Sequence, residues 1–109
     1  MKITATRTLV KSAPELWELL DGEPQLRHWS ERLNEGDGAV EVTAREPGRL
    51  LAWRSNGSRT VKVKIKLVET GFGTRVAITA KAIDGLRQDD LEQVLEELAE
   101  PQRRPFTAA

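Results

Sequence analysis

The sequence predicts an α+β domain in which a curved antiparallel β-sheet wraps around a long C-terminal helix, with two short helices after the first strand. Three patterns carry this prediction. Residues 12–33 have the spacing of two short helices, and residues 40–82 alternate apolar with polar side chains. Residues 91–98 place apolar side chains at i, i+3, i+4 and i+7, the pattern of an amphipathic helix.

The first strand is expected over residues 2–10, where apolar residues alternate with threonines. A first helix starts at Ser12, because its hydroxyl can accept a hydrogen bond from a free backbone N–H and Glu15 follows three residues later, as in a capping box. It runs to about Leu20. A second short helix then covers residues 24–33, opened by a proline.

Four further strands are expected, each followed by a turn signal or by the last helix. They cover residues 40–44, 50–53, 61–67 and 76–82. The first of them alternates Val40, Val42 and Ala44 with polar residues. The third alternates apolar residues with Lys62, Lys64 and Lys66, a stripe that could follow a row of phosphates but is more simply the solvent face of a half-buried sheet.

The last helix carries the apolar stripe Leu91, Val94, Leu95 and Leu98, and Pro101 ends it. Between residues 84 and 100 the chain has seven acidic residues and one basic residue, which indicates a solvated outer face. The domain organisation predicted is one domain over residues 1–100, followed by a C-terminal tail over residues 101–109.

Composition excludes several classes of function. The 109 residues carry 17 basic and 17 acidic side chains, so the net charge of +0 argues against a nucleic-acid partner. With no cysteine and one histidine, we expect no metal site, and we predict no cofactor. No apolar run is long enough to span a membrane, and a cytoplasmic location is predicted.

Four segments carry a resemblance to a known family. The sequence has SAPELWELL after the first strand, LRHW in the second helix, VTAREPGRLLAWRS in the middle and ETGFGTRVAITAKA before the last helix. In this order they resemble the helix-grip superfamily (SRPBCC), which includes START-like lipid-transfer domains and polyketide cyclases. The resemblance implies an apolar cavity between the sheet and the C-terminal helix. Family members usually have two more strands before residues 40–44, so this chain resembles a shortened member with a reduced cavity.

Six residues are the candidate ligand-binding set of this cavity. They are Trp29, Leu33, Trp53, Arg54, Arg75 and Leu95. Large aromatic rings commonly line pockets for apolar ligands, and Trp29 is the strongest candidate for ligand contact, whereas Trp17 is expected in the core. Arg54 and Arg75 either enter the cavity and hold a carboxylate or pair with surface acids.

His28 is the one candidate catalytic residue, because an imidazole can act as general acid or base at neutral pH. The alternative, which we favour, is a solvated or capping residue on a short helix. No common nucleotide, protease or redox motif is present, so enzymatic activity is the less favoured prediction.

The function predicted is binding of a small hydrophobic or amphipathic ligand. A polyketide cyclase or dehydratase-like enzyme and an interaction module with a closed cavity are the alternatives. A homodimer is a further hypothesis. It would form through the exposed edge of strand 40–44, with Glu41 and Arg45 pairing across a two-fold axis, or through apolar surface near Trp29.

Overall fold

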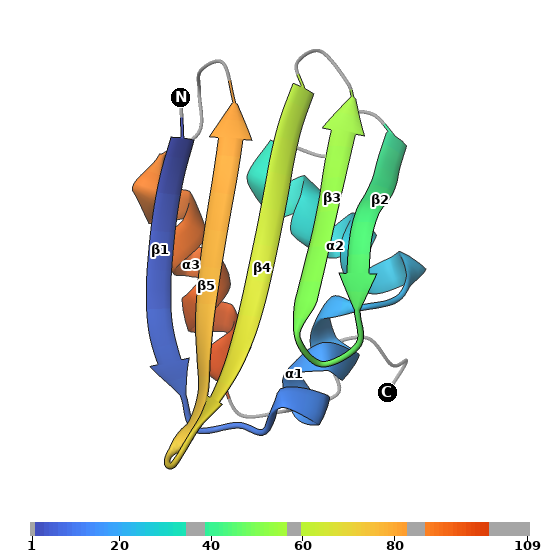
Figure 1. Ribbon diagram of the computed structural model, residues 1–109. Helices are drawn as coiled ribbons and strands as arrows, with labels where there is room; N and C mark the ends of the chain where they lie inside the picture. The colour runs from blue at the N-terminus through green and yellow to red at the C-terminus, as the bar shows by residue number, and fades with distance from the viewer. Residues whose placement is uncertain (1, 35–38, 57–59, 83–86, 101–109) are drawn as a thin grey trace.

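The computed structural model describes residues 2–34, 39–56, 60–82 and 87–100 of the chain (Figure 1). Its elements are β1 (Lys2–Leu9), α1 (Ala13–Leu20), α2 (Glu23–Asn34), β2 (Ala39–Glu46), β3 (Leu50–Asn56), β4 (Thr60–Thr70), β5 (Gly73–Ala82) and α3 (Gln88–Ala99). This is the order that the sequence predicts. The predicted tail over residues 101–109 lies outside the described residues.

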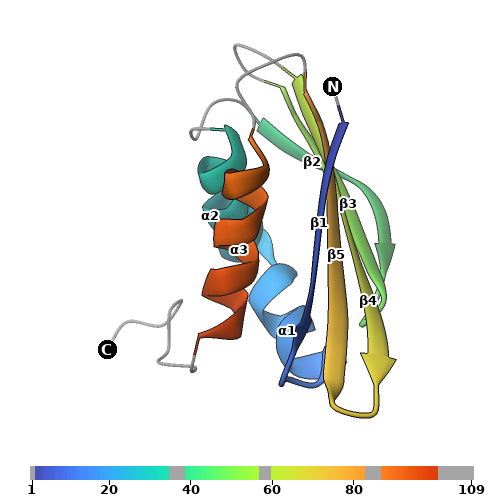
Figure 2. The same ribbon diagram turned by 90° about the vertical axis from the view of Figure 1, so that its left-hand side faces the viewer.

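The five strands form one antiparallel sheet in the order β1-β5-β4-β3-β2. The first strand therefore pairs with the last, from Lys2 opposite Lys81 to Leu9 opposite Thr74. All three helices cover the same face of the sheet, which we call the inner face (Figure 2). The fold thus has two layers, with β1 and β2 at the edges of the sheet and no helix over the outer face in the part of the chain described.

The first helix begins where the capping box predicts. The Ser12 hydroxyl accepts from the Glu15 backbone N–H at 3.2 Å, and the Glu15 carboxylate accepts from the Ser12 backbone N–H at 3.3 Å. These two bonds satisfy donors that a helix start otherwise leaves free. Gly22, with a φ of 118°, then turns the chain sharply between α1 and α2.

A β-bulge corrects the simple alternation predicted for β2. Val42 lies opposite Trp53, but the next paired residue is Ala44, opposite Ala52. Since Trp53 and Ala52 are neighbours on β3, their side chains point to opposite faces, and so do those of Val42 and Ala44. The prediction that both share one face is wrong, because Thr43 is an extra residue in the ladder.

The hydrophobic core lies between the inner face and the helices. The predicted α3 stripe is buried in full, as are the inward residues of β4; they are Leu91, Val94, Leu95 and Leu98, and Val61, Val63, Ile65 and Leu67. All belong to one apolar cluster. α3 lies along β1 and against α2, so the last helix closes the edge of the sheet that the first strand forms. None of the described helices has both the length and the apolar character needed to cross a bilayer.

Candidate functional site

Four of the six predicted ligand-binding residues meet in the interior. Trp29 and Leu33 come from α2, Trp53 from β3 and Leu95 from α3, and each is at most 2% exposed. All four belong to the core cluster. The amphipathic pattern of the helices and the alternation of β3 bring them to the same side of the sheet. Trp17, predicted to be core, is partly buried and packs against the same cluster.

Trp29 is held by a hydrogen bond inside the protein. Its indole Nε1–H donates to the backbone carbonyl of Leu19 at 2.8 Å, which ties α2 to the last turn of α1. The polar atom of this side chain is therefore satisfied, and its ring packs with the core. Trp29 can offer a ligand apolar contact but not its N–H.

Trp53 differs from Trp29 in this respect. Its Nε1–H is buried and has no hydrogen-bond partner, although the side chain is only 1% exposed. Two residues further along the same face of β3, the Ser55 hydroxyl lies 3.3 Å from the hydroxyl of Ser30 on α2, and both serines are buried. A polar patch of three residues (Trp53, Ser55, Ser30) thus sits between α2 and β3 inside an apolar core.

This polar patch was not predicted from the sequence. The available signal was that Ser30 and Ser55 stand where the helical and strand periodicities call for apolar residues. Neither serine was predicted to be a site residue, because a single buried serine is common in any core. Only the pairing of α2 with β3 shows that they face each other.

Arg54 and Arg75 lie outside this interior, so the alternative in which they enter the cavity is wrong, and Arg54 follows the other alternative by pairing with a surface acid. Arg54 is the neighbour of inward-facing Trp53, and its guanidinium pairs with Glu41 of β2 on the outer face. Arg75 is exposed and lies between the buried residues Thr74 and Val76. The period of two places both arginines on the face away from the helices, so neither is positioned to hold a ligand carboxylate between the layers.

His28 has a partner that sequence spacing did not reveal. Its Nε2 contacts a carboxylate oxygen of Glu97 on α3, and both side chains are about one-third exposed or less, at 32% and 26%. The imidazole also meets the Trp29 ring edge-on, with centroids 4.7 Å apart. His28 therefore joins α2 to α3, a contact that the favoured prediction of a solvated or capping histidine did not include.

A groove runs where α3 meets β1. It has a volume of about 290 Å³, and its lining includes Ala5 and Arg7 of β1 together with Glu92 and Leu95 of α3. At one end Gln88 donates from its side-chain amide to the backbone carbonyl of Thr4 at 3.1 Å. Leu95 thus links this groove to the core. In the described segments no three histidine, aspartate or glutamate side chains are placed to share a metal ion.

No protein-family model and no curated protein matches the chain, but solved structures do. Protein MLL2253 from Mesorhizobium loti superposes with a TM-score of 0.71 at 17% identity, over 91% of this chain and 94% of that one. The Aha1 dimer from Colwellia psychrerythraea gives 0.69 at 13% identity, over 91% and 93%. CalU16 from Micromonospora echinospora gives 0.67 at 17% identity, over 90% and 71%.

Likeness at these identities concerns the fold. The α+β order, the five-stranded antiparallel sheet and the C-terminal helix packed against its inner face agree with those structures over nine-tenths of the chain. This agreement confirms the fold that the sequence resemblance implied. The chain has the helix-grip fold, in a form with five strands.

Proposed function

We propose that this domain binds a small hydrophobic or amphipathic molecule between its sheet and its helices. The helix-grip fold supports the proposal, because it holds apolar side chains from both layers around one interior. Sites for small ligands are mostly apolar, with a few polar groups that fix the orientation of the ligand. The interior of this chain has that composition, with two tryptophans and several leucines around the polar patch Trp53, Ser55 and Ser30.

The observation that carries the proposal is the unpaired Nε1–H of Trp53. A buried donor without an acceptor costs about 1–3 kcal/mol. A ligand oxygen placed beside the indole would accept this hydrogen bond, while the rest of the ligand contacts the apolar side chains. The ligand predicted is therefore amphipathic, with at least one hydrogen-bond acceptor.

The groove between α3 and β1 supports an entry route. It lies at an edge of the sheet, where one helix covers one strand, and it reaches buried Leu95. Opening this contact requires only that α3 move away from β1, without breaking the ladder of the sheet. We propose that the ligand enters here.

The experiment has two steps. Native mass spectrometry of the protein purified from its own host looks for a bound small molecule, and a fluorescence titration with anilinonaphthalene sulfonate measures saturable binding of an amphipathic probe. We expect Trp53→Phe, which keeps a ring but removes the N–H, to weaken probe binding up to about tenfold. The matched control Trp17→Phe, at a partly buried position away from the patch, should leave it unchanged.

The absence of both a bound molecule and saturable probe binding would reject the proposal in favour of an interaction module with a closed cavity. Equal loss of affinity in Trp53→Phe and Trp17→Phe would show that the indole N–H of Trp53 is not the ligand contact. A cooperative unfolding transition in each variant is required, since the probe also binds partly unfolded protein.

A second candidate function follows from the contact between His28 and Glu97. A histidine oriented by a carboxylate is the arrangement of a general base, as a cyclase or dehydratase would need. The pair bridges the two helices and remains partly exposed, instead of facing the polar patch inside, which favours binding over catalysis. If it is catalytic, His28→Ala should reduce turnover about 100-fold or more; unchanged turnover would reject the enzyme.

Assembly into a homodimer through the β2 edge also remains a proposal. The Aha1 protein from Colwellia psychrerythraea, which has a similar fold, is a dimer, and this supports the proposal, as does the position of β2 at the edge of the sheet. The side chains named by the sequence are engaged within the chain, Glu41 with Arg54 and Arg45 with Asp21. Trp29 is buried and offers no apolar surface. The contact proposed is therefore backbone pairing between the β2 strands of two chains. We also propose that the protein is located in the cytoplasm.

A further inference from the structure

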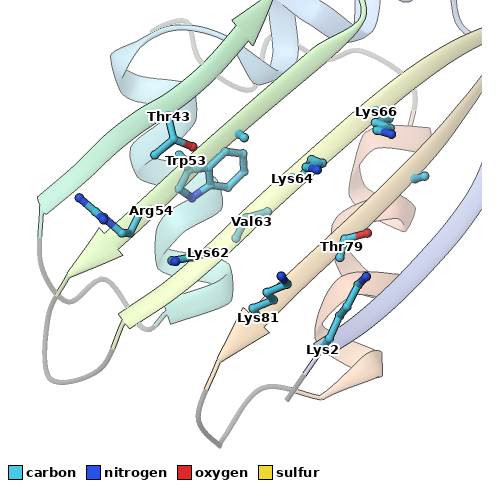
Figure 3. A pocket seen from close by; sticks show the side chains of 12 residues that line it. Lys2, Thr43, Trp53, Arg54, Lys62, Val63, Lys64, Lys66, Thr79 and Lys81 are labelled. Atoms are coloured by element: carbon cyan, nitrogen blue, oxygen red, sulfur yellow. The ribbon is translucent and has the colours of Figure 1, made fainter.

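The outer face of the sheet carries a hollow surrounded by basic side chains (Figure 3). Its volume is about 470 Å³. Six cationic residues line it: Lys2, Arg54, Lys62, Lys64, Lys66 and Lys81. They come from β1, β3, β4 and β5, so the cluster exists only in the folded sheet. This hollow lies on the opposite face from the interior of the proposed function. Trp53 borders both, but none of the six cationic residues belongs to the core cluster.

The register of the sheet places these charges side by side. Lys62 is directly opposite Lys81 on one side and Arg54 on the other, and Lys81 is opposite Lys2. Neighbouring strands are about 4.8 Å apart, and like charges directly opposite each other destabilise a sheet. Arg54 is compensated by Glu41. Within the described part of the chain, the five lysines have no ion pair and no side-chain hydrogen bond.

The net charge of +0 for the whole chain does not show how its charges are distributed over the fold. The exposed acids of α3 and its C-cap lie in the helical layer, with the whole sheet between them and the hollow; they are Asp89, Glu92 and Glu96 of the helix and Glu100 directly after it. The field over the outer face is therefore set by the lysines, and it falls off within about 10 Å at ordinary salt. Such a field attracts an anion that comes close to the sheet.

Small residues make up the floor of the hollow. Ala52 and Ala77 leave space between the lysine stems, and Thr43 and Thr79 add hydroxyl groups. Thr43 is the extra residue of the β-bulge, which brings it to the border of this site. A hydroxyl can donate to an anionic oxygen at the floor while the ammonium groups approach from the rim.

We propose that this hollow binds a soluble ligand with two or three linked phosphate groups. Lysine ammonium groups bind phosphate oxygens as compact point charges, and several of them can surround a ligand that carries more than one negative charge. Lys62 and Lys66 are four residues apart on β4, about 13 Å, and the row from Lys62 to Lys2 spans about 10 Å. A chain of linked phosphates can therefore contact several ammonium groups at once, and the volume suits a small molecule.

Two larger anionic partners fit the surface less well. Nucleic acid bound as a single strand needs exposed aromatic rings for stacking, and Trp53, the aromatic residue beside the hollow, is 1% exposed. A bilayer would call for exposed apolar side chains in the same place. Those described, Val10, Val68 and Phe72, gather instead near the turn between β4 and β5 and do not line the hollow.

The test is a calorimetric titration of the whole protein with inorganic tripolyphosphate at constant ionic strength. We expect saturable one-to-one binding that weakens as salt is raised. Lys62→Gln with Lys81→Gln should reduce the affinity about tenfold or more, because two charge-assisted contacts are lost. Arg27→Gln with Arg49→Gln removes the same charge at exposed positions outside the hollow and should change the affinity less than about twofold.

Folding does not obscure the result, because relieving repulsion between Lys62 and Lys81 should leave the thermal unfolding temperature of the double variant unchanged or higher. The proposal is overturned if tripolyphosphate does not bind, or if both double variants lose affinity equally. Binding only to vesicles of phosphatidylcholine and phosphatidylserine, or only to oligothymidylate, also overturns it and assigns the face to a membrane or to nucleic acid. None of these outcomes depends on ligand binding in the interior.

Discussion

Replacing Leu95 by alanine tests how the last helix is held against the sheet. Leu95 is 2% exposed, belongs to the core cluster and also borders the groove between α3 and β1. The substitution removes three carbon atoms from the core. At about 0.8 kcal/mol for each buried CH₂ group, the lost transfer free energy is about 2.4 kcal/mol.

The cavity left behind normally adds to this loss and brings Leu→Ala changes to about 2–5 kcal/mol. At Leu95 the new space joins a groove of about 290 Å³, so solvent and neighbouring side chains can fill it. We therefore expect a loss near the lower end, about 2.5–3 kcal/mol. Leu98, which is 0% exposed and does not line the groove, should lose more on the same change, about 3–4 kcal/mol.

Urea unfolding followed by tryptophan fluorescence measures both free energies of unfolding, since three tryptophans report on the fold. Gln93→Ala, an exposed position on the same helix, is the control and should change the free energy by less than about 0.5 kcal/mol. A loss below about 0.5 kcal/mol for Leu95→Ala would show that α3 is not packed as described. A larger loss at Leu95 than at Leu98 would refute the role given to the groove.

Three further predictions concern the start of α1, the turn before β5 and assembly. Ser12→Ala should lower the free energy of unfolding by about 1 kcal/mol, because one bond of the capping box is lost; circular dichroism during urea unfolding measures it. Gly73→Ala should lower the free energy of unfolding by more than about 1 kcal/mol in the same assay, because Gly73 has a φ of +151° and the new Cβ would overlap the carbonyl oxygen of Leu9. Gly71→Ala is the control, since a Cβ there meets no atom within 4 Å. Sedimentation equilibrium at micromolar concentration should show a dimer, and the mass of one chain at every concentration would refute pairing through β2.

The local signals of the sequence were sufficient for the elements. The capping box at Ser12, the alternation of β4 and the i, i+3, i+4, i+7 stripe of α3 each depend on residues near one another in the chain, and each is confirmed. The bulge in β2 was missed, because an inserted residue changes the register without changing the composition of the strand. The resemblance of four segments then led to the helix-grip fold, which the solved structures support.

Only part of the candidate site could be predicted from the sequence. Its apolar members, such as Trp29 and Trp53, could be named because periodicity marks the buried face of each element. Arg54 and Arg75 were candidate ligand contacts with surface pairing as the alternative, and the same periodicity, applied to their buried neighbours, places both on the outer face.

What the sequence determined by itself is the set of elements, their buried faces and their order, because these follow from side chains a few residues apart. The tertiary structure alone decided which distant groups meet: His28 with Glu97, Ser30 with Ser55, and Lys81 with Lys62 and Lys2. These contacts depend on strand order, register and helix docking. Those arise from the packing of the whole core, so no local pattern encodes the unpaired indole N–H of Trp53 or the basic hollow on the outer face.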